Sequence, residues 1–167
     1  MSETTERQDL NTKAIAILRI GVGILFLIFG EYKVFGTKFI FGGGFQHWID
    51  IFLGGGAYPF MVPVLRNFVL AHATPIAFLV AYGEFTIGLA LTFGLLVRPA
   101  SACGCIYMFT LLFSSNYPGE HAELWQYFGA SLDHFVLAIC FVSFLLGHPS
   151  QAFSVLRFLP PKFRNLG

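Results

Sequence analysis

The chain has 167 residues, of which 56% are hydrophobic and only 11% are charged, and its mean hydropathy is +0.70. Soluble domains carry about 25% charged residues, so this composition excludes an ordinary soluble enzyme as well as a disordered chain. Ten Lys and Arg residues against nine Asp and Glu residues leave a net charge of +1, which provides no basic surface for nucleic acid. The expected partner is therefore the lipid bilayer.

Residues 1–13 are polar and of mixed charge, and we interpret them as an N-terminal tail. An apolar stretch over about residues 14–34 follows. As a helix it is long enough to cross the roughly 30 Å of bilayer hydrocarbon, and no small-x-small cleavage site follows it. We therefore expect a retained first transmembrane span.

The loop over residues 35–74 is long and unusually apolar. Two glycine triplets, at 42–44 and 54–56, bracket the sequence FQHWIDIFL. In this segment apolar side chains recur at helical spacing, whereas Gln46, His47 and Asp50 fall off the stripe. The stripe consists of Phe45, Trp48, Ile49, Phe52 and Leu53. It predicts a short helix that lies in the outer membrane interface or caps the bundle.

Three more apolar segments, at about residues 75–97, 99–117 and 127–147, predict an all-α membrane protein with an antiparallel bundle of four transmembrane helices over residues 14–147. Arg98 and Pro99 separate the second and third spans, so we expect a tight helical hairpin there. Residues 148–167 form an amphipathic basic C-terminal tail, predicted to lie on the inner membrane surface and to end at Pro160-Pro161.

Basic residues predict the orientation of the bundle. With four spans both termini share one side of the membrane, and that side carries six basic residues against three on the other side. The six are Arg7, Lys13, Arg98, Arg157, Lys162 and Arg164, and the three are Lys33, Lys38 and Arg66. This favours cytoplasmic termini in a bacterial-type inner membrane.

Each predicted span has one face of small and polar residues at helical spacing, which is typical of helices that pack closely in membranes. The first face contains Arg19, Gly23, Phe26, Gly30 and Lys33; the second Ala77, Ala81, Glu84 and Gly88; the third Cys105, Leu112, Ser115 and Asn116; the fourth Gly129, Asp133, Val136, Cys140, Ser143 and Gly147. We expect all four faces to point inward.

Depth along the helices indicates where the polar groups meet. Glu84 lies about 13 Å and Asp133 about 9 Å below the outer ends of their spans at 1.5 Å per residue. Lys33, Glu84, Asn116 and Asp133 are therefore expected to converge in the outer half of the bundle, with Arg19 and Arg98 in the inner half or at its rim. His134 is displaced by about 100° from Asp133 around the helix.

Every one of these groups also has a structural interpretation. Glu84 and Asp133 are either carboxyls that join helices or groups that handle protons or substrate. Lys33 and Arg19 either face the interior or snorkel to the interface. Arg98 is equally an anchor on a tight turn, and Asn116 a helix cap.

The sequence predicts no haem, iron–sulfur or metal site. Cys103, Cys105 and Cys140 lie in apolar segments and form no CxxC or CxxCH pattern. A lone intramembrane His134 has no second histidine at matching depth, so it is a poor haem or metal ligand. We interpret the cysteines as small packing residues.

Two segments resemble a known family. They are Leu18-Arg19-Ile20-Gly21 with Phe29-Gly30-Glu31-Tyr32-Lys33, and Glu84-x-x-x-Gly88 with Gly94-Leu95-Leu96-Val97-Arg98-Pro99-Ala100. This pattern resembles the DoxX/DoxD family of four-helix membrane proteins over about residues 14–147. The resemblance implies a membrane redox role, one branch being similar to the large subunit of thiosulfate:quinone oxidoreductase with a small DoxA-type partner. It implies functional roles for Arg19, Lys33, Glu84 and Arg98.

These observations leave three functions open. The first is a component of a quinone-linked redox system for small sulfur compounds. In it Glu84 and Asp133 are the candidate catalytic, proton-relaying groups, and the candidate substrate- or quinone-binding residues are Arg19, Lys33, Arg98, Asn116 and His134. The second is a non-enzymatic scaffold or assembly partner, and the third a small transporter or lipid-binding protein with a Glu84/Asp133 polar site. A small partner subunit or a homo-oligomer is compatible with each.

Overall fold

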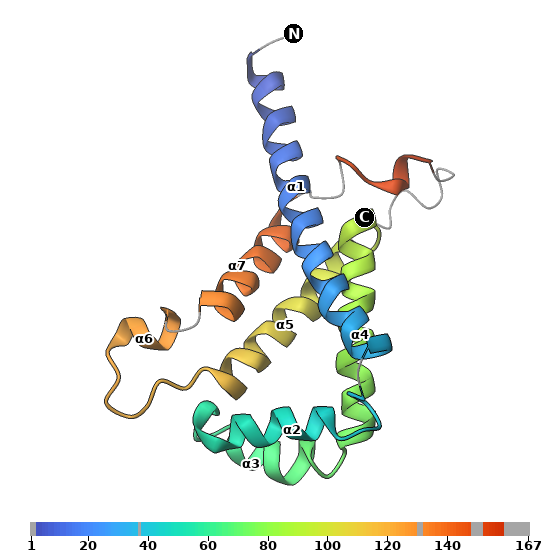
Figure 1. The fold of residues 1–167 in the computed structure, drawn as a ribbon. Coiled ribbons are helices and arrows are strands. Elements are labelled where there is room, and N and C mark those ends of the chain that lie inside the picture. Colours follow the sequence, from blue (N-terminus) through green and yellow to red (C-terminus); the bar gives the residue numbers. More distant parts are fainter. Residues whose placement is uncertain (1–2, 37, 130–131, 148–151, 159–167) are drawn as a thin grey trace.

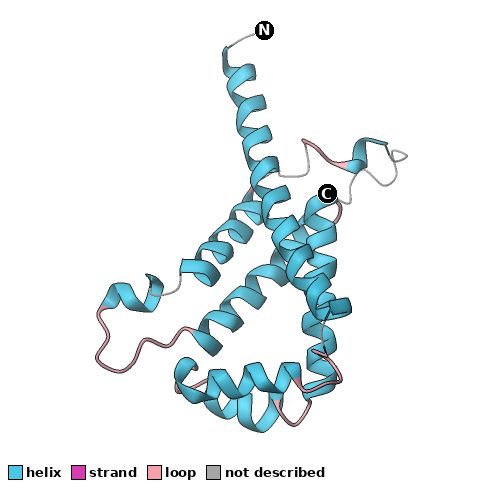
Figure 2. Ribbon diagram, in the orientation of Figure 1, coloured by secondary structure: helices cyan, strands magenta, loops and turns pink. Residues whose placement is uncertain are grey.

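A computed structural model describes residues 3–36, 38–129, 132–147 and 152–158 of the chain, and all regular elements in these ranges are helical (Figures 1 and 2). The main helices are α1 (Glu3–Glu31), α2 (Gly44–Ile51), α4 (Ala73–Phe93), α5 (Val97–Ser115) and α7 (Leu132–Leu146). The short elements are α3 (Val62–Val64), α6 (Leu124–Gly129), three π-helical turns at Tyr32–Gly36, Phe52–Gly56 and Leu65–Val69, and a 3-10 turn at Val155–Phe158.

Three helices in the described ranges are long and apolar enough to cross a membrane, so the expected all-α membrane class is confirmed. They run over Glu6–Phe35, Ala73–Phe93 and Val97–Ser115. The fourth apolar helix, α7, has 15 residues, which corresponds to about 22 Å and falls short of the bilayer core. The complete four-span bundle therefore stays a prediction.

Two helix boundaries differ from those expected. Helix α1 begins at Glu3, so most of the polar segment 1–13 continues the first helix as an exposed extension. The turn between α4 and α5 lies at Gly94–Leu96 and not at Arg98–Pro99. Gly94 (φ 70°) and Leu96 (φ 51°) both adopt left-handed backbone there. Pro99 lies in the first turn of α5. Backbone N–H groups in the first turn have no hydrogen-bond partner within the helix, so proline, which has no N–H, is tolerated there.

Helix α1 packs along α4, and α5 packs along α7, as Figure 1 shows. The α1–α4 contact is made through glycines. A Cβ added to Gly23 would lie 2.7 Å from the backbone N of Thr92, and one added to Gly30 would lie 2.6 Å from the backbone N of Phe85. The small-residue faces predicted for residues 14–34 and 75–97 thus form this interface, and both predictions are confirmed.

The prediction for the inward face of α7 is wrong. Asp133 is 60% exposed, and Val136 and Ser143 also lie on the exposed side. The buried side chains of α7 are Ala138, Phe141 and Phe144. Burying two aromatic rings gains more apolar area than burying cysteine and serine, and the ring of Phe141 occupies the space beside Gly104 of α5.

The buried face of α5 also differs from the predicted one. It follows Ser101, Gly104, Met108 and Leu112, so Leu112 is the fully buried member of the predicted set. Met108 and the α7 rings join Phe26 of α1 in one core cluster, with the Phe26 and Phe141 ring centroids 5.2 Å apart at 86°.

The long loop forms a helical cap over the ends of α4 and α5 (Figure 1). Phe45 and Ile49 of α2 are buried and Phe52 and Leu53 pack against the same cluster, so the predicted short helix is confirmed. Trp48 of the predicted stripe is exposed, as are His47 and Asp50. The cap is joined to the end of α5 by backbone hydrogen bonds, from Tyr58 N to Phe113 O (2.9 Å) and from Tyr117 N to Gly56 O (2.8 Å).

Most of the predicted C-terminal tail, including Pro160-Pro161, Lys162 and Arg164, lies outside the described residues. Residues 152–158 are described and lie against the α4–α5 turn. Ser154 Oγ donates a hydrogen bond to Gly94 O at 2.8 Å. This segment and the turn therefore lie at the same end of the bundle, opposite the helical cap.

Candidate functional site

A buried carboxylate lies at the centre of the bundle. Glu84 is near the middle of the 21-residue helix α4, and its relative exposure is 5%. It shares its face with Ala77, Ala81 and Gly88, which are also buried. The small neighbours let α1 approach closely, and this brings the end of α1 to the level of Glu84.

Lys33 of the first π-helical turn forms an ion pair with Glu84. Its Nζ lies 2.5 Å from both Oε1 and Oε2 of the carboxylate. Tyr107 of α5 donates a third hydrogen bond from its hydroxyl to Oε1, also at 2.5 Å. We call these three residues the carboxylate triad. A buried charge is costly unless it is paired and hydrogen-bonded, and the partners of Glu84 come from two other segments. The triad therefore joins the end of α1 to α4 and α5 at one point.

Of the four groups predicted to converge, Lys33 and Glu84 do meet, whereas Asn116 bonds His134 elsewhere and Asp133 is exposed. Tyr107 was missed. An inward tyrosine in an apolar helix looks like any lipid-facing aromatic residue in sequence. One sequence signal was available: Ser114 follows Tyr107 by seven residues, or about two helical turns, so both polar side chains fall on the same side of α5.

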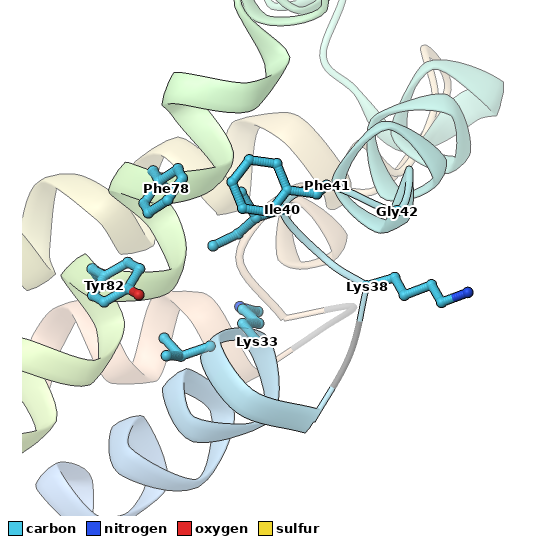
Figure 3. Close-up of a pocket in the computed structure, with 8 residues that line it drawn as sticks. Lys33, Lys38, Ile40, Phe41, Gly42, Phe78 and Tyr82 are labelled. Atoms are coloured by element: carbon cyan, nitrogen blue, oxygen red, sulfur yellow. The ribbon is translucent and has the colours of Figure 1, made fainter.

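An open cavity of about 390 Å³ adjoins the triad through Lys33 (Figure 3). Its aromatic walls are Phe41, Phe78 and Tyr82. The Phe78 and Tyr82 rings stack with centroids 5.3 Å apart, and Phe41 meets Phe78 edge-on at 5.5 Å. In Figure 3 the Lys38 side chain extends away from these rings. Both lysines line the cavity, and Lys33 is the one that is paired with Glu84.

Lys33 retains capacity for a ligand. An ammonium group has three N–H donors, and the two Glu84 oxygens take two of them. The Nζ atom also lies 5.5 Å from the centroid of the Phe39 ring. The site therefore combines a cationic donor, a carboxylate and a phenol in a largely apolar setting.

A second polar cluster connects α5 with α7. Asn116, the residue that ends α5, accepts hydrogen bonds at Oδ1 from Ser115 Oγ (2.6 Å) and from His134 Nδ1 (2.9 Å). Since an amide oxygen only accepts, His134 carries a proton on Nδ1 in this arrangement. In the first turn of the same helix, Asp133 Oδ1 accepts a hydrogen bond from the His134 backbone N–H at 2.8 Å.

The remaining predicted site residues lie elsewhere. Arg19 is fully buried, and its Nη2 donates to Phe153 O at 2.7 Å. It is 14 residues before Lys33, which corresponds to about 21 Å along the helix. Arg98 is exposed in the first turn of α5. The structure thus divides the predicted set into the carboxylate triad, the Asn116–His134 cluster and two arginines at the opposite end.

Within the residues that the structure describes, no group of three or more His, Cys, Asp or Glu side chains is placed to hold a metal ion. Cys103, Cys105 and Cys140 are free thiols.

Comparison with known proteins gives one match. A protein-family model described as DoxX matches residues 14–116, which include the apolar part of α1, the helical cap, α4 and α5. No curated protein and no solved structure matches the chain significantly. The matched range contains all three residues of the carboxylate triad.

Proposed function

The chain belongs to the DoxX family, and on that premise we propose that it is the membrane component of a quinone-linked redox system that acts on small sulfur compounds. The observation that carries the proposal is the carboxylate triad, in which a buried Glu84 holds Lys33 beside an aromatic cavity. Buried ionisable groups within membrane helices are expensive, and they commonly mark substrate or proton pathways.

The cavity beside Lys33 suits a small sulfur anion. The third N–H of the Lys33 ammonium can donate to an anionic oxygen or sulfur, and the charge-assisted bond is strengthened by the apolar surroundings. Sulfur is polarisable and contacts aromatic rings favourably, and the Phe41, Phe78 and Tyr82 rings surround this position. Lys33 would bind and orient the anion while Glu84 holds the ammonium in place.

A bound quinone would supply the electron sink, because the reduction of a quinone takes up two electrons and two protons. The electrons come from two sulfur anions, which lose one electron each as a sulfur–sulfur bond forms between them. Two ring-lined cavities, of about 390 and 410 Å³, fall within the size range of small-molecule sites. The described helices therefore have room for both reactants.

The triad is suited to holding and moving protons. Tyr107 O–H and Lys33 N–H both point at the Glu84 carboxylate, so a proton on any of the three groups can be shared along short hydrogen bonds. Asp133, exposed at the cap end of α7, offers a carboxylate for exchange with water. We propose these groups as the proton-handling residues.

The proposed membrane location and orientation follow from the basic residues at the two ends of the bundle. We propose an inner-membrane location with the termini in the cytoplasm, because basic residues favour that side. Figure 1 shows the start of α1 at the same end of the bundle as residues 152–158 and the α4–α5 turn, which is consistent with this orientation. A small partner subunit or a second copy of the chain completes the system in this proposal.

The test uses the full chain in mild detergent with the partner subunit supplied, and it measures quinone reduction with thiosulfate as donor. Glu84→Gln keeps the size of the side chain and removes the carboxylate, so we expect turnover to fall about 100-fold, within the range of a lost proton-transfer group. Asp50→Asn, an exposed carboxylate of α2, is the matched control and should not change turnover.

Two outcomes would overturn the proposal. If the wild-type protein neither retains quinone nor reduces it, the redox role is wrong and a scaffold or lipid-binding role takes its place. If turnover occurs but Glu84→Gln is as fast as wild type, the triad is structural and the site lies elsewhere.

A further inference from the structure

A second open cavity, of about 410 Å³, lies on the other side of α5, between the helical cap, α6 and α7. Five of its seven lining residues are aromatic: Tyr58, Phe109, Phe113, Tyr127 and Phe135. The other two are leucines, one of which is Leu124, so none of the lining residues carries a formal charge. We call this the aromatic cavity.

The walls of the aromatic cavity are fixed by the backbone. Tyr58 N donates to Phe113 O at 2.9 Å, and this bond holds the two rings edge to face with centroids 5.5 Å apart. Tyr127 is held by a hydrogen bond from its hydroxyl to Gly119 O at 2.9 Å. A ligand would therefore meet preformed ring surfaces, which lowers the entropy cost of binding.

The lining selects an uncharged, flat ligand. A charged molecule would lose its hydration without gaining an opposite charge, whereas a planar ring can stack on, or meet edge-on, several of the five rings. The volume suits a small bicyclic compound. Such a molecule would reach the cavity from the bilayer, because α5 is one of the apolar membrane-spanning candidates.

One wall offers a hydrogen-bond donor. The Tyr58 hydroxyl is 3.5 Å from the Tyr127 backbone oxygen, which is at the outer limit of a hydrogen bond, so it can turn toward a ligand oxygen at little cost. Burial, together with the nearby Tyr127 and Tyr117, raises the pKa of Tyr58 above its ordinary value. The hydroxyl therefore keeps its proton and can donate to a carbonyl.

From these four features we propose that the aromatic cavity binds a flat, uncharged ring compound with a carbonyl oxygen. This inference rests on the proposed function, under which the ligand is the quinone ring. The sulfur anion then binds in the other cavity, beside Lys33. Tyr107 and Phe109 are two residues apart on α5 and so point about 200° away from each other. The triad and the aromatic cavity thus lie on opposite faces of one helix.

The experiment measures binding of menadione, a naphthoquinone without a long tail, to the full chain in detergent. Leu124→Trp fills the cavity from a side chain that is 76% exposed, so the fold has no reason to change. We expect its Kd for menadione to rise at least about tenfold, and that of Phe113→Ala to rise similarly. Leu79→Trp, at a 73% exposed position of α4 outside both cavities, is the matched control and should bind as wild type.

Two further measurements test the ligand class. Tyr58→Phe removes the hydroxyl and keeps the ring, and it should weaken menadione binding about threefold to tenfold through the lost hydrogen bond. Decalin, a saturated bicyclic hydrocarbon of similar size, should compete poorly. If decalin displaces menadione equally well, the cavity is a hydrocarbon pocket and the proposal of a carbonyl-bearing ring is wrong.

The outcomes separate this inference from the function on which it rests. If wild type binds menadione and Leu124→Trp binds it equally well, the quinone lies elsewhere and the inference fails while the redox role stands. If wild type binds no menadione and reduces no quinone, the redox role itself fails. Should Phe113→Ala not fold, Leu124→Trp decides the question alone.

Discussion

Two cations lie on the same face of the first span, Arg19 within α1 and Lys33 in the π-helical turn that follows it, and they are held in opposite ways. Arg19 is fully buried, and its guanidinium donates to a backbone carbonyl of the C-terminal segment. Lys33 forms an ion pair with the Glu84 carboxylate and lines a cavity. Arg19 therefore fastens one end of the bundle, whereas Lys33 presents a charge to an open space.

This difference shows that position on a helical face does not determine what an intramembrane cation does. Both residues follow the same spacing as Gly23 and Gly30, and both carry one positive charge. A guanidinium with several donors in a rigid plane suits fixed carbonyl acceptors, whereas an ammonium is a compact charge that can exchange partners. The neighbours supplied by other helices decide between the two uses.

The largest expected effect comes from breaking the Lys33 end. Lys33→Met leaves the Glu84 carboxylate buried without its cation, and removing one partner of a buried pair typically costs about 3–5 kcal/mol of unfolding free energy. Unfolding by denaturant in mild detergent measures this. The double variant Lys33→Met with Glu84→Leu should recover most of the loss. Equal stability of the single variant and wild type would mean that the pair contributes nothing.

The next effect is at the third member of the triad. Tyr107→Phe keeps the ring and removes the donor to Glu84 Oε1, and a hydrogen bond to a charged group contributes about 1.5–3 kcal/mol. We expect an intermediate loss of stability together with slower quinone reduction. Thr110→Val, an exposed position one turn later whose hydroxyl bonds within its own helix, serves as control. A Tyr107→Phe protein identical to wild type in both measurements would contradict the hydrogen bond.

A change at the opposite end sharpens the comparison. Arg19→Met removes the guanidinium from Phe153 O, and a buried acceptor that loses its donor costs about 1–3 kcal/mol. Stability should therefore fall, while menadione affinity stays within about twofold of wild type because the site is about 21 Å away along α1. If Arg19→Met lowered menadione affinity by as much free energy as it lowered stability, the two ends would be coupled. The contrast drawn between Arg19 and Lys33 would then be wrong.

The smallest effect is expected at Asp133. Its side chain is 60% exposed and its contact is to the backbone of the next residue, so Asp133→Asn should change the unfolding free energy by no more than about 0.5 kcal/mol. Glu84→Gln, measured in parallel, should cost several times more. A large loss at Asp133 would mean that α7 turns its other face inward in the membrane.

The sequence was sufficient to predict the α1–α4 half of the molecule. There, glycines and charged residues share single faces, and both the close approach of two helices and the pairing of buried charges demand that pattern. Lys33 and Glu84 were therefore brought together by their helical spacing and by their depth along the helices. The helix in the long loop was predicted for a similar reason, because its apolar stripe has clear helical periodicity.

The α5–α7 half was harder to predict, because in a membrane both the buried side chains and the lipid-facing side chains are apolar. In α7 both faces are apolar, so polarity does not determine which face is buried. The buried face is determined by the fit of Phe141 against Gly104 and Phe26, which helical spacing does not predict. The position of the α4–α5 turn depended on two left-handed residues, Gly94 and Leu96, and the second of these is not revealed by composition. Tyr107 was missed because an aromatic residue suits both lipid and a polar interior.

The pairing of α1 has a consequence for biogenesis. Arg19 of α1 and Lys33 of the turn that follows it leave the ribosome early, yet Glu84 follows Lys33 by 51 residues and Phe153 follows Arg19 by 134 residues. A charged side chain near the centre of a helix costs about 2.5–3.5 kcal/mol on insertion scales. The contact of Lys33 with Glu84 therefore forms only after α4 has been synthesised, and that of Arg19 with Phe153 only when nearly the whole chain has been synthesised.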